Sequence, residues 1–253
     1  MRILVSNDDG IDAPGIALLE KIAKKFSDDV YVFAPNSNMS GAGHSLTLNT
    51  PLRMKEHDDH HFSVNGTPTD SVIMALRYLL KEKPDFVFSG INLDANLADD
   101  VTYSGTVAAA IEACLFDIPA IAFSQRLTKD GKANWDVAET YAPVVLKVII
   151  DNYKFNKGVF LNVNFPACQV SEVKGIKVTS QGSRAINDHV IRFIDPRGDP
   201  YFWIGAAEYR REDTNRDFST DLGAVHSHYV SVTPMTINMT AKNEINILRE
   251  LFS

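Results

Sequence analysis

The sequence predicts a doubly wound α/β fold, in which helices cover both faces of a mostly parallel β-sheet. Two observations carry this prediction. Short apolar segments that suit buried strands alternate with longer segments whose apolar residues recur at helical spacing. Continuously apolar strands are typical of parallel sheets buried on both faces, and the helices between them supply right-handed crossovers. We therefore expect an α/β core in residues 1–174.

The strands and helices of this core follow from the apolar pattern. Pro14 suits the first turn of the first helix, because that position needs no N–H donor. Thr69 or Asp70 is available to cap the second helix. Strands are expected at residues 3–6, 30–34, 86–89, 120–124 and 159–164, and helices at residues 14–26, 70–80, 106–116 and 137–150.

The alternation ends after about residue 174. Strands are expected at 176–179, 190–194 and 201–204, the last two joined as a hairpin, with a closing helix at 240–252. Such a tail is too small to form its own core, so we expect it to pack on the main domain or on another subunit. The His- and Asp-rich segment 57–61 resembles a metal cluster but is interpreted as a solvated turn between strands.

Composition limits the classes of function. The chain has 253 residues, 45% of them hydrophobic and 23% charged, which fits a globular protein and excludes wholesale disorder. A net charge of −7 argues against binding to nucleic acid or to an anionic membrane. Cys114 and Cys168 match no metal or redox spacing and are interpreted as reduced core residues. With no signal region and no membrane-spanning run, we expect a cytoplasmic protein.

The most informative polar motif follows the first expected strand, residues 3–6. Asn7, Asp8, Asp9 and Gly10 stand directly after that strand. Two carboxylates at the end of a rigid strand suit a hard divalent cation. Taken alone, an Asp-Asp-Gly motif is more commonly a helix cap and a turn.

Three further polar loops follow an expected strand or precede a helix, at residues 37–45, 89–92 and 103–106. The carboxyl ends of parallel strands share one sheet edge, so these loops are expected to converge on the two carboxylates. Each loop alone also fits a surface loop or a helix cap. Together their oxygen donors favour Mg²⁺ or Mn²⁺ over zinc, with Ser40 and Asn92 as neutral ligands. Free N–H groups at a helix start would add an anion cradle, which predicts a metal-assisted phosphate site.

Several motifs, in this order, carry a resemblance to a known family: residues 6–10 (SNDDG), 40–45 (SGAGHS), 66–70 (GTPTD), 89–92 (SGIN) and 100–107 (DVTYSGTV). Along nearly its whole length the chain resembles the survival protein SurE family of metal-dependent nucleotidases. Because several separate motifs agree in order, chance is a poor explanation of the resemblance.

The resemblance implies a single domain, residues 1–253, with a Rossmann-like three-layer core and a β-rich C-terminal extension, residues 175–253, that serves oligomerisation. It implies homodimers or homotetramers formed by exchange of C-terminal segments. The implied activity is dephosphorylation of nucleoside 5′-monophosphates and often 3′-monophosphates, sometimes with cleavage of short polyphosphate. The implied ligands of one divalent cation, Mg²⁺ or Mn²⁺, are Asp8, Asp9, Ser40 and Asn92.

One loop departs from the family pattern. Where the family usually reads Gly-x-Asn-x-Gly, this chain keeps Asn96 but has Asp94 and Ala98 in place of the glycines. If both positions have positive φ, aspartate tolerates that better than alanine, whose cost is about 1 kcal/mol or somewhat more. Asp94 would also add a negative charge beside an anion site.

The expected mechanism is direct attack of a metal-activated water on a phosphate monoester. Asp8 or Asp9 would orient or deprotonate the water, and the sequence does not choose between them. His44 is a candidate to protonate the leaving oxygen, although a structural role is favoured. The expected phosphate contacts are Asn96, Ser104, Gly105 and Thr106.

Other classes of protein stay open for comparison. A phosphoacceptor receiver needs an aspartate after its third strand and a lysine after its fifth, where this chain has Ser89-Gly90 and Ser124-Gln125. A covalent aspartyl phosphatase needs an Asp-x-Asp motif, which is absent. A non-catalytic nucleotide sensor would keep the site but bind without turnover.

Overall fold

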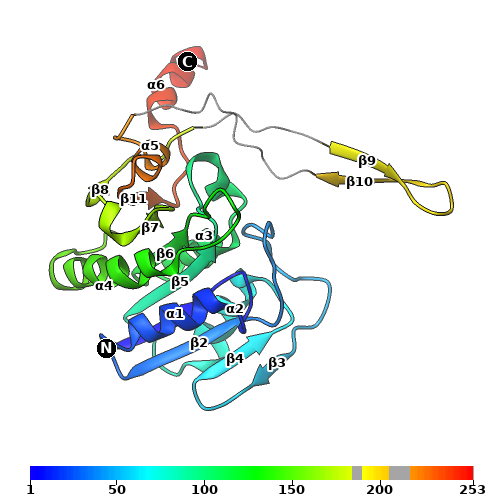
Figure 1. The fold of residues 1–253 in the computed structure, drawn as a ribbon, viewed down its shortest axis with the longest axis horizontal. Helices are drawn as coiled ribbons and strands as arrows, with labels where there is room; N and C mark the ends of the chain where they lie inside the picture. The colour runs from blue at the N-terminus through cyan, green and yellow to red at the C-terminus, as the bar shows by residue number, and fades with distance from the viewer. Residues whose placement is uncertain (184–189, 205–216, 253) are drawn as a thin grey trace.

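A nine-stranded mixed sheet forms the centre of the molecule (Figure 1). The computed structural model describes residues 1–183, 190–204 and 217–252. The strand order is β3-β4-β2-β1-β5-β6-β7-β11-β8, and all neighbours are parallel except β3 with β4 and β11 with β7. The strands are β1 (Arg2–Ser6), β2 (Asp29–Pro35), β3 (Met54–Glu56), β4 (His61–Val64), β5 (Phe86–Leu93), β6 (Ala120–Gln125), β7 (Val159–Phe165), β8 (Ile176–Val178) and β11 (Val230–Thr236).

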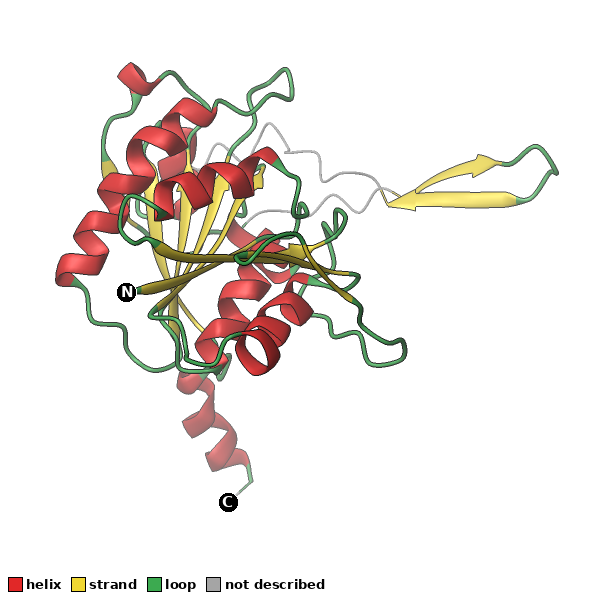
Figure 2. Cartoon of the chain, turned by 90° about the horizontal axis from the view of Figure 1, so that it is seen from below, coloured by secondary structure: helices red, strands yellow, loops and turns green. Residues whose placement is uncertain are grey.

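Helices cover both faces of this sheet, as Figure 2 shows. One face carries α1 (Pro14–Ala23) and α4 (Trp135–Asn152), which bury residues such as Ile16 and Leu146 against the strands. The other face carries α2 (Pro68–Met74) and α3 (Gly105–Leu115), with Val72 and Val107 in a second core cluster. The predicted doubly wound α/β fold is therefore confirmed.

Two core elements differ from their expected bounds. The expected helix 70–80 is instead α2 followed by a π-helical turn, η1 (Ala75–Leu79). Its cap is Thr67, which lies before Pro68 and forms a reciprocal capping box with Asp70, so the caps expected from Thr69 or Asp70 were wrong. Strand β5 runs on to Leu93, four residues past its expected end at residue 89, and so includes Asn92.

Much of the chain's C-terminal part belongs to the main sheet. Strands β8 and β11 extend it beyond β7, which confirms that the tail packs on the main domain. The sequence did not predict β11 or the short helix before it, α5 (Asp221–His226). A short turn, η3 (Val170–Glu172), follows β7.

The hairpin and the closing helix are present as expected. Strands β9 (Val190–Ile194) and β10 (Pro200–Ile204) pair only with each other within the described chain, and Figure 1 shows them as an arm beside the main body. Helix α6 (Lys242–Leu251) lies near the C-terminus. Residues 57–60 form an exposed turn between β3 and β4, as interpreted from the sequence. None of the described helices is long and apolar enough to cross a membrane.

Candidate metal and phosphate site

The turn after β1 is built by its own amide and glycine. Asn7 donates through Nδ2 to the carbonyl of Gly10 (2.9 Å) and accepts the N–H of Gly10 (3.2 Å). Gly10 has φ +104°, and a Cβ there would approach the carbonyl carbon of Ser37 to 3.2 Å. The N–H of Met39 also donates to the carbonyl of Asp8 (2.7 Å), so the loop after β2 is fastened to the acidic turn.

Asp8 is a buried carboxylate at the N-terminus of α3. Its side chain is 3% exposed, and Thr106 donates its hydroxyl to Oδ1. Burial raises the pKa of Asp8 to about 6; the Thr106 bond opposes this rise, and the charge of Asp9 adds to it. Gly105 leaves the room for this carboxylate, because a Cβ there would lie 2.7 Å from the Cβ of Asp8. A cation bound here would favour the ionised form that burial disfavours.

A hydrogen bond joins Asp9, in the turn after β1, to the end of β5, where Asn92 lies. Asp9 accepts the N–H of Leu93 through Oδ2 (3.0 Å), and burial raises the pKa of its carboxyl in spite of that bond. Asn92 is 9% exposed and donates Nδ2 to the carbonyl of Asp94 (2.7 Å), which fixes the orientation of its amide. Since Nδ2 is occupied, Oδ1 is the atom with which Asn92 can serve a cation.

Ser40 lies on the exposed rim of the same region. It follows Met39, whose N–H reaches the carbonyl of Asp8, and its own N–H donates to Asn38 Oδ1 (2.8 Å). The four expected ligands thus stand on three segments, the turn after β1, the loop after β2 and the end of β5, which are joined by the Met39–Asp8 and Leu93–Asp9 hydrogen bonds. Their donors are all oxygens and include two carboxylates with raised pKa values, which fits a hard cation such as Mg²⁺ or Mn²⁺.

The loop after β5 is left-handed at the two positions that depart from the family pattern. Asp94 has φ +90° and Ala98 has φ +52°, so the condition of positive φ considered for both positions is met. Asp94 directs its carboxylate at backbone donors, accepting the N–H groups of Ala95 (2.7 Å) and Leu127 (3.3 Å) through Oδ1. The negative charge of Asp94 is therefore engaged by backbone donors of its own loop and of the segment after β6.

Asn96 is the centre of a buried amide network. Its N–H donates to Asn164 Oδ1 (2.9 Å), and its Nδ2 donates to Ser124 Oγ (2.8 Å). Its carbonyl accepts from Asn162 (2.9 Å) and Asn164 (3.1 Å). Sequence reasoning missed Ser124, Asn162 and Asn164. Asn162 and Asn164 interrupt an otherwise apolar buried strand, and this pattern could have revealed them as site residues, because buried amides need hydrogen-bond partners.

The start of α3 supplies backbone donors beside Asp8. Ser104 is the helix cap and accepts the N–H of Val107 through Oγ (3.0 Å), so the capping alternative for this residue is confirmed. The N–H groups of Gly105 and Thr106 lie in the first turn, where a helix has no carbonyl of its own for them. A helix N-terminus of this kind favours an anion.

His44 contacts this helix through its imidazole. Its Nε2 lies 2.8 Å from Oε2 of Glu112, a residue of α3 that is 8% exposed. The N–H of Gly43 donates to the carbonyl of Tyr103 (3.1 Å) and so fastens the loop to the segment before α3. These contacts support the structural interpretation of His44 over an acid catalyst.

Fold and site together define a doubly wound α/β protein with an acidic oxygen-donor site facing a helix N-terminus at the carboxyl edge of its sheet. The chain belongs to the SurE family: the model of the survival protein SurE matches residues 3–188. It is 46% identical over 253 residues to the "5'-nucleotidase SurE" of Paramagnetospirillum magneticum, covering 100% of this chain and 96% of that protein.

Other relatives agree with this assignment. The "5'-nucleotidase SurE" of Brucella anthropi is 47% identical over 244 residues, covering 95% of this chain and 93% of that protein. The crystal structure of the SurE protein from Aquifex aeolicus superimposes with a TM-score of 0.84 at 39% identity and covers 100% of both chains. The similarity therefore extends over the sequence and the fold of the whole chain.

Proposed function

We propose that this chain is a metal-dependent phosphomonoesterase that hydrolyses nucleoside 5′-monophosphates. The observation that carries the proposal is the buried Asp8 carboxylate, with its raised pKa, beside Asp9 and against the first turn of α3. Relatives that share nearly the whole chain are named 5'-nucleotidase SurE, which supports this substrate class. We extend the proposal to 3′-monophosphates and to short polyphosphate.

One divalent cation, Mg²⁺ or Mn²⁺, would be held by oxygens of Asp8, Asp9, Ser40 and Asn92. When bound, such a cation lowers the pKa of a coordinated water and neutralises charge on the phosphate. Thr106 holds Asp8 in place through its hydroxyl, and the N–H of Leu93 holds Asp9. Both carboxylates are thus oriented before any ligand binds, and either can accept the proton of the attacking water.

The phosphate would lie at the N-terminus of α3. The N–H groups of Gly105 and Thr106 and the helix dipole provide positive potential there. Ser104 accepts a backbone bond as cap and keeps its hydroxyl proton as a donor. Asn96 is held by its buried amide network and would contribute from the facing loop.

The experiment is a phosphate-release panel with the purified protein. It covers nucleoside 5′- and 3′-monophosphates and short polyphosphate, each with Mg²⁺ or Mn²⁺. Release from 5′-monophosphates supports the proposal. Measurable nucleotide affinity without release would favour a sensor, and a stable acyl phosphate formed from acetyl phosphate would favour a receiver.

We also propose that residues 175–253 mediate assembly by exchange between copies, while residues 1–253 form one domain. Two features support a second copy of the chain as the partner. Hairpin β9–β10 exposes apolar side chains, and a groove of about 540 Å³ beside α4 is mostly apolar. The exposed side chains include Ile191, Phe193, Phe202, Trp203 and Ile204, and the groove is lined by Val145, Val148, Val178 and Val232 among others.

Helix α6 suits the same partner, since Ile247, Leu248 and Leu251 are exposed on it. We expect sedimentation to give a dimer or tetramer for the full chain and a smaller assembly after removal of residues 242–253. A monomeric full chain would contradict exchange.

A further inference from the structure

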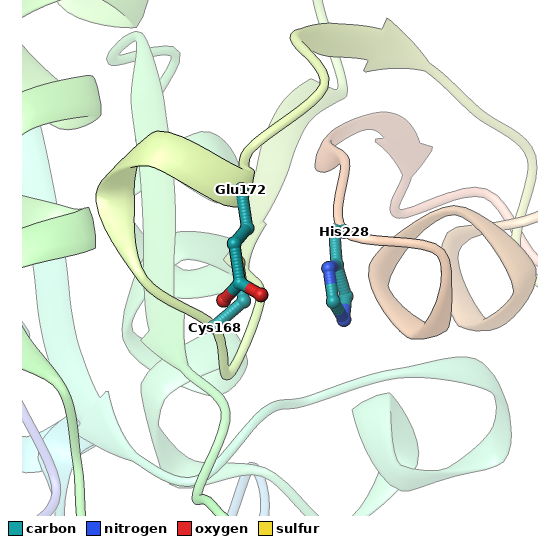
Figure 3. A group of neighbouring side chains, drawn as sticks. All are labelled: Cys168, Glu172 and His228. Carbon is teal, nitrogen blue, oxygen red and sulfur yellow. The ribbon is translucent and has the colours of Figure 1, made fainter.

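A mixed cluster of metal-binding side chains shares no residue with the proposed phosphate site. The Cys168 thiol, the Glu172 carboxylate and the His228 imidazole each offer one ligand atom, and these atoms lie within 4.8 Å of one another. Figure 3 shows the three side chains facing a common space between the turn after β7 and the turn after α5. We propose that this triad, Cys168–Glu172–His228, is a zinc site.

The donor set selects the metal. A thiolate, an imidazole and a carboxylate are typical zinc ligands, whereas Mg²⁺ and Mn²⁺ prefer oxygen donors only. The two negative charges of a thiolate and a carboxylate balance Zn²⁺. With zinc bonds of about 2.0–2.3 Å, a tetrahedron brings ligand atoms to about 3.3–3.7 Å from one another, so closing the site needs small side-chain rotations. Three protein ligands leave a fourth position for water.

Hydrogen bonds hold each of the three ligand residues, and two of these bonds join distant segments of the chain. Asn134 donates to the carbonyl of Cys168 (2.8 Å), and the N–H of Gln169, a local donor, binds Glu172 Oε2 (2.7 Å). His228 has φ +66°, and its carbonyl accepts the N–H of Lys174 (2.9 Å). The left-handed turn at residue 228 therefore brings an imidazole opposite a turn some sixty residues earlier in the chain.

Solvent and cations can reach the site. Cys168 is 8% exposed, but it borders a hollow of about 520 Å³ that is also lined by Glu172, Asp130 and Asp136. Lys132 also lines this hollow and pairs with Asp130 (3.1 Å), but three carboxylates against one ammonium leave the lining negative, which favours cations at the entrance. Burial first, and the charge of Glu172 second, raise the pKa of the Cys168 thiol, so zinc would displace a proton on binding.

The site would join two parts of the molecule. Cys168 and Glu172 follow β7, whereas His228 lies between α5 and β11. Helix α5 begins at Asp221, which accepts the N–H of Ala98 in the loop after β5. Zinc would thus clamp α5 to the sheet at the end opposite to its contact with that loop, which predicts that the bound ion stabilises the fold.

The test uses Co²⁺ as a spectroscopic substitute for zinc in the chelator-treated full chain. We expect a thiolate-to-cobalt charge-transfer band that zinc abolishes by displacement. The band should persist in Asp9→Asn, which disables the proposed phosphate site, and in Cys114→Ser, which removes the other cysteine. It should vanish in Cys168→Ser. A failed nucleotidase proposal would leave this result unchanged.

Two further variants keep the test decisive if Cys168→Ser folds poorly. His228→Asn keeps a residue type that tolerates positive φ, and Glu172→Gln keeps the shape of the side chain. Each should weaken zinc binding in calorimetry by about tenfold or more and abolish the zinc-dependent rise in Tm. Absence of the cobalt band in the wild type, or its persistence in Cys168→Ser, would overturn the proposal.

Discussion

The carboxylate of Asp221 accepts the backbone N–H of Ala98 at 3.0 Å, although the two residues are 123 positions apart. Ala98 is left-handed with φ +52°, and Gln181 donates to its carbonyl (3.0 Å). The loop that faces the proposed phosphate site is therefore completed by residues from the C-terminal part of the chain. These two bonds hold Ala98 in a left-handed conformation that costs a non-glycine residue about 1 kcal/mol or somewhat more.

Asp221→Ala should damage both stability and activity. Asp221 is fully buried and also accepts the N–H groups of Gly182 and Leu222, so the substitution leaves three backbone donors without their acceptor. We expect a loss of about 3 kcal/mol or more in the free energy of unfolding. Urea denaturation measures this loss.

Ala98→Gly is the matched change at the other end of this bond. Glycine stabilises the folded chain by about 1 kcal/mol, because it removes the cost of the left-handed conformation. It also raises the conformational entropy of the unfolded chain, which destabilises the fold by a similar amount. We therefore expect stability within about 1 kcal/mol of wild type and retained phosphate release. A variant as damaged as Asp221→Ala would show that the loop depends on the alanine side chain.

Gly105→Ala should impair the proposed catalytic site without unfolding the protein. The added methyl group would meet the Cβ of Asp8 at 2.7 Å and its Oδ2 at 3.0 Å, so the carboxylate must move. We expect kcat/KM for a nucleoside 5′-monophosphate to fall at least about tenfold, which corresponds to about 1.4 kcal/mol in the barrier. Steady-state kinetics and Tm, measured on the same preparation, separate the two effects. Unchanged kcat/KM would place the reacting phosphate elsewhere.

Asp8→Asn should stabilise the metal-free protein at neutral pH. Folding raises the pKa of Asp8 from 3.8 to about 6, so the folded chain holds this proton more tightly than the unfolded chain. Stability from this group is highest below about pH 4 and falls as pH rises through about 6, by up to about 3 kcal/mol. Asparagine removes that dependence.

Chemical denaturation of the wild type and of Asp8→Asn in EDTA, at about pH 4 and about pH 7.5, tests whether the wild type alone loses stability as the pH rises. Added Mg²⁺ or Mn²⁺ should raise the stability of the wild type but not that of Asp8→Asn. If the wild type is the more stable protein in EDTA at the higher pH, burial does not raise the pKa of the Asp8 carboxyl.

The core of the fold was predictable because its elements are local. The apolar strands and amphipathic helices each show their period within a few residues, and parallel strands necessarily bring Asp9 and Asn92 to one edge. The departure from the family pattern also drew attention to Asp94 and Ala98, which the structure shows at positive φ. These inferences need no knowledge of distant contacts.

The rest depended on contacts between distant segments. Strand β11 contains Pro234 and pairs antiparallel with β7, which the alternation of strands and helices gives no reason to expect. The buried partners of Asn96 and the Asp221–Ala98 bond join residues far apart in sequence. The Cys168 side chain meets His228 only after β11 enters the sheet, so cysteine spacing carried no signal of it.

Metal removal and restoration test the central claim most directly. Phosphate release from a nucleoside 5′-monophosphate is measured with the wild type and with Asp9→Asn, first in EDTA and then with excess Mg²⁺ or Mn²⁺. The account predicts no release by the wild type in EDTA, restored release after either metal is added, and little release by Asp9→Asn in any condition. Full release in EDTA, or by Asp9→Asn, would contradict it.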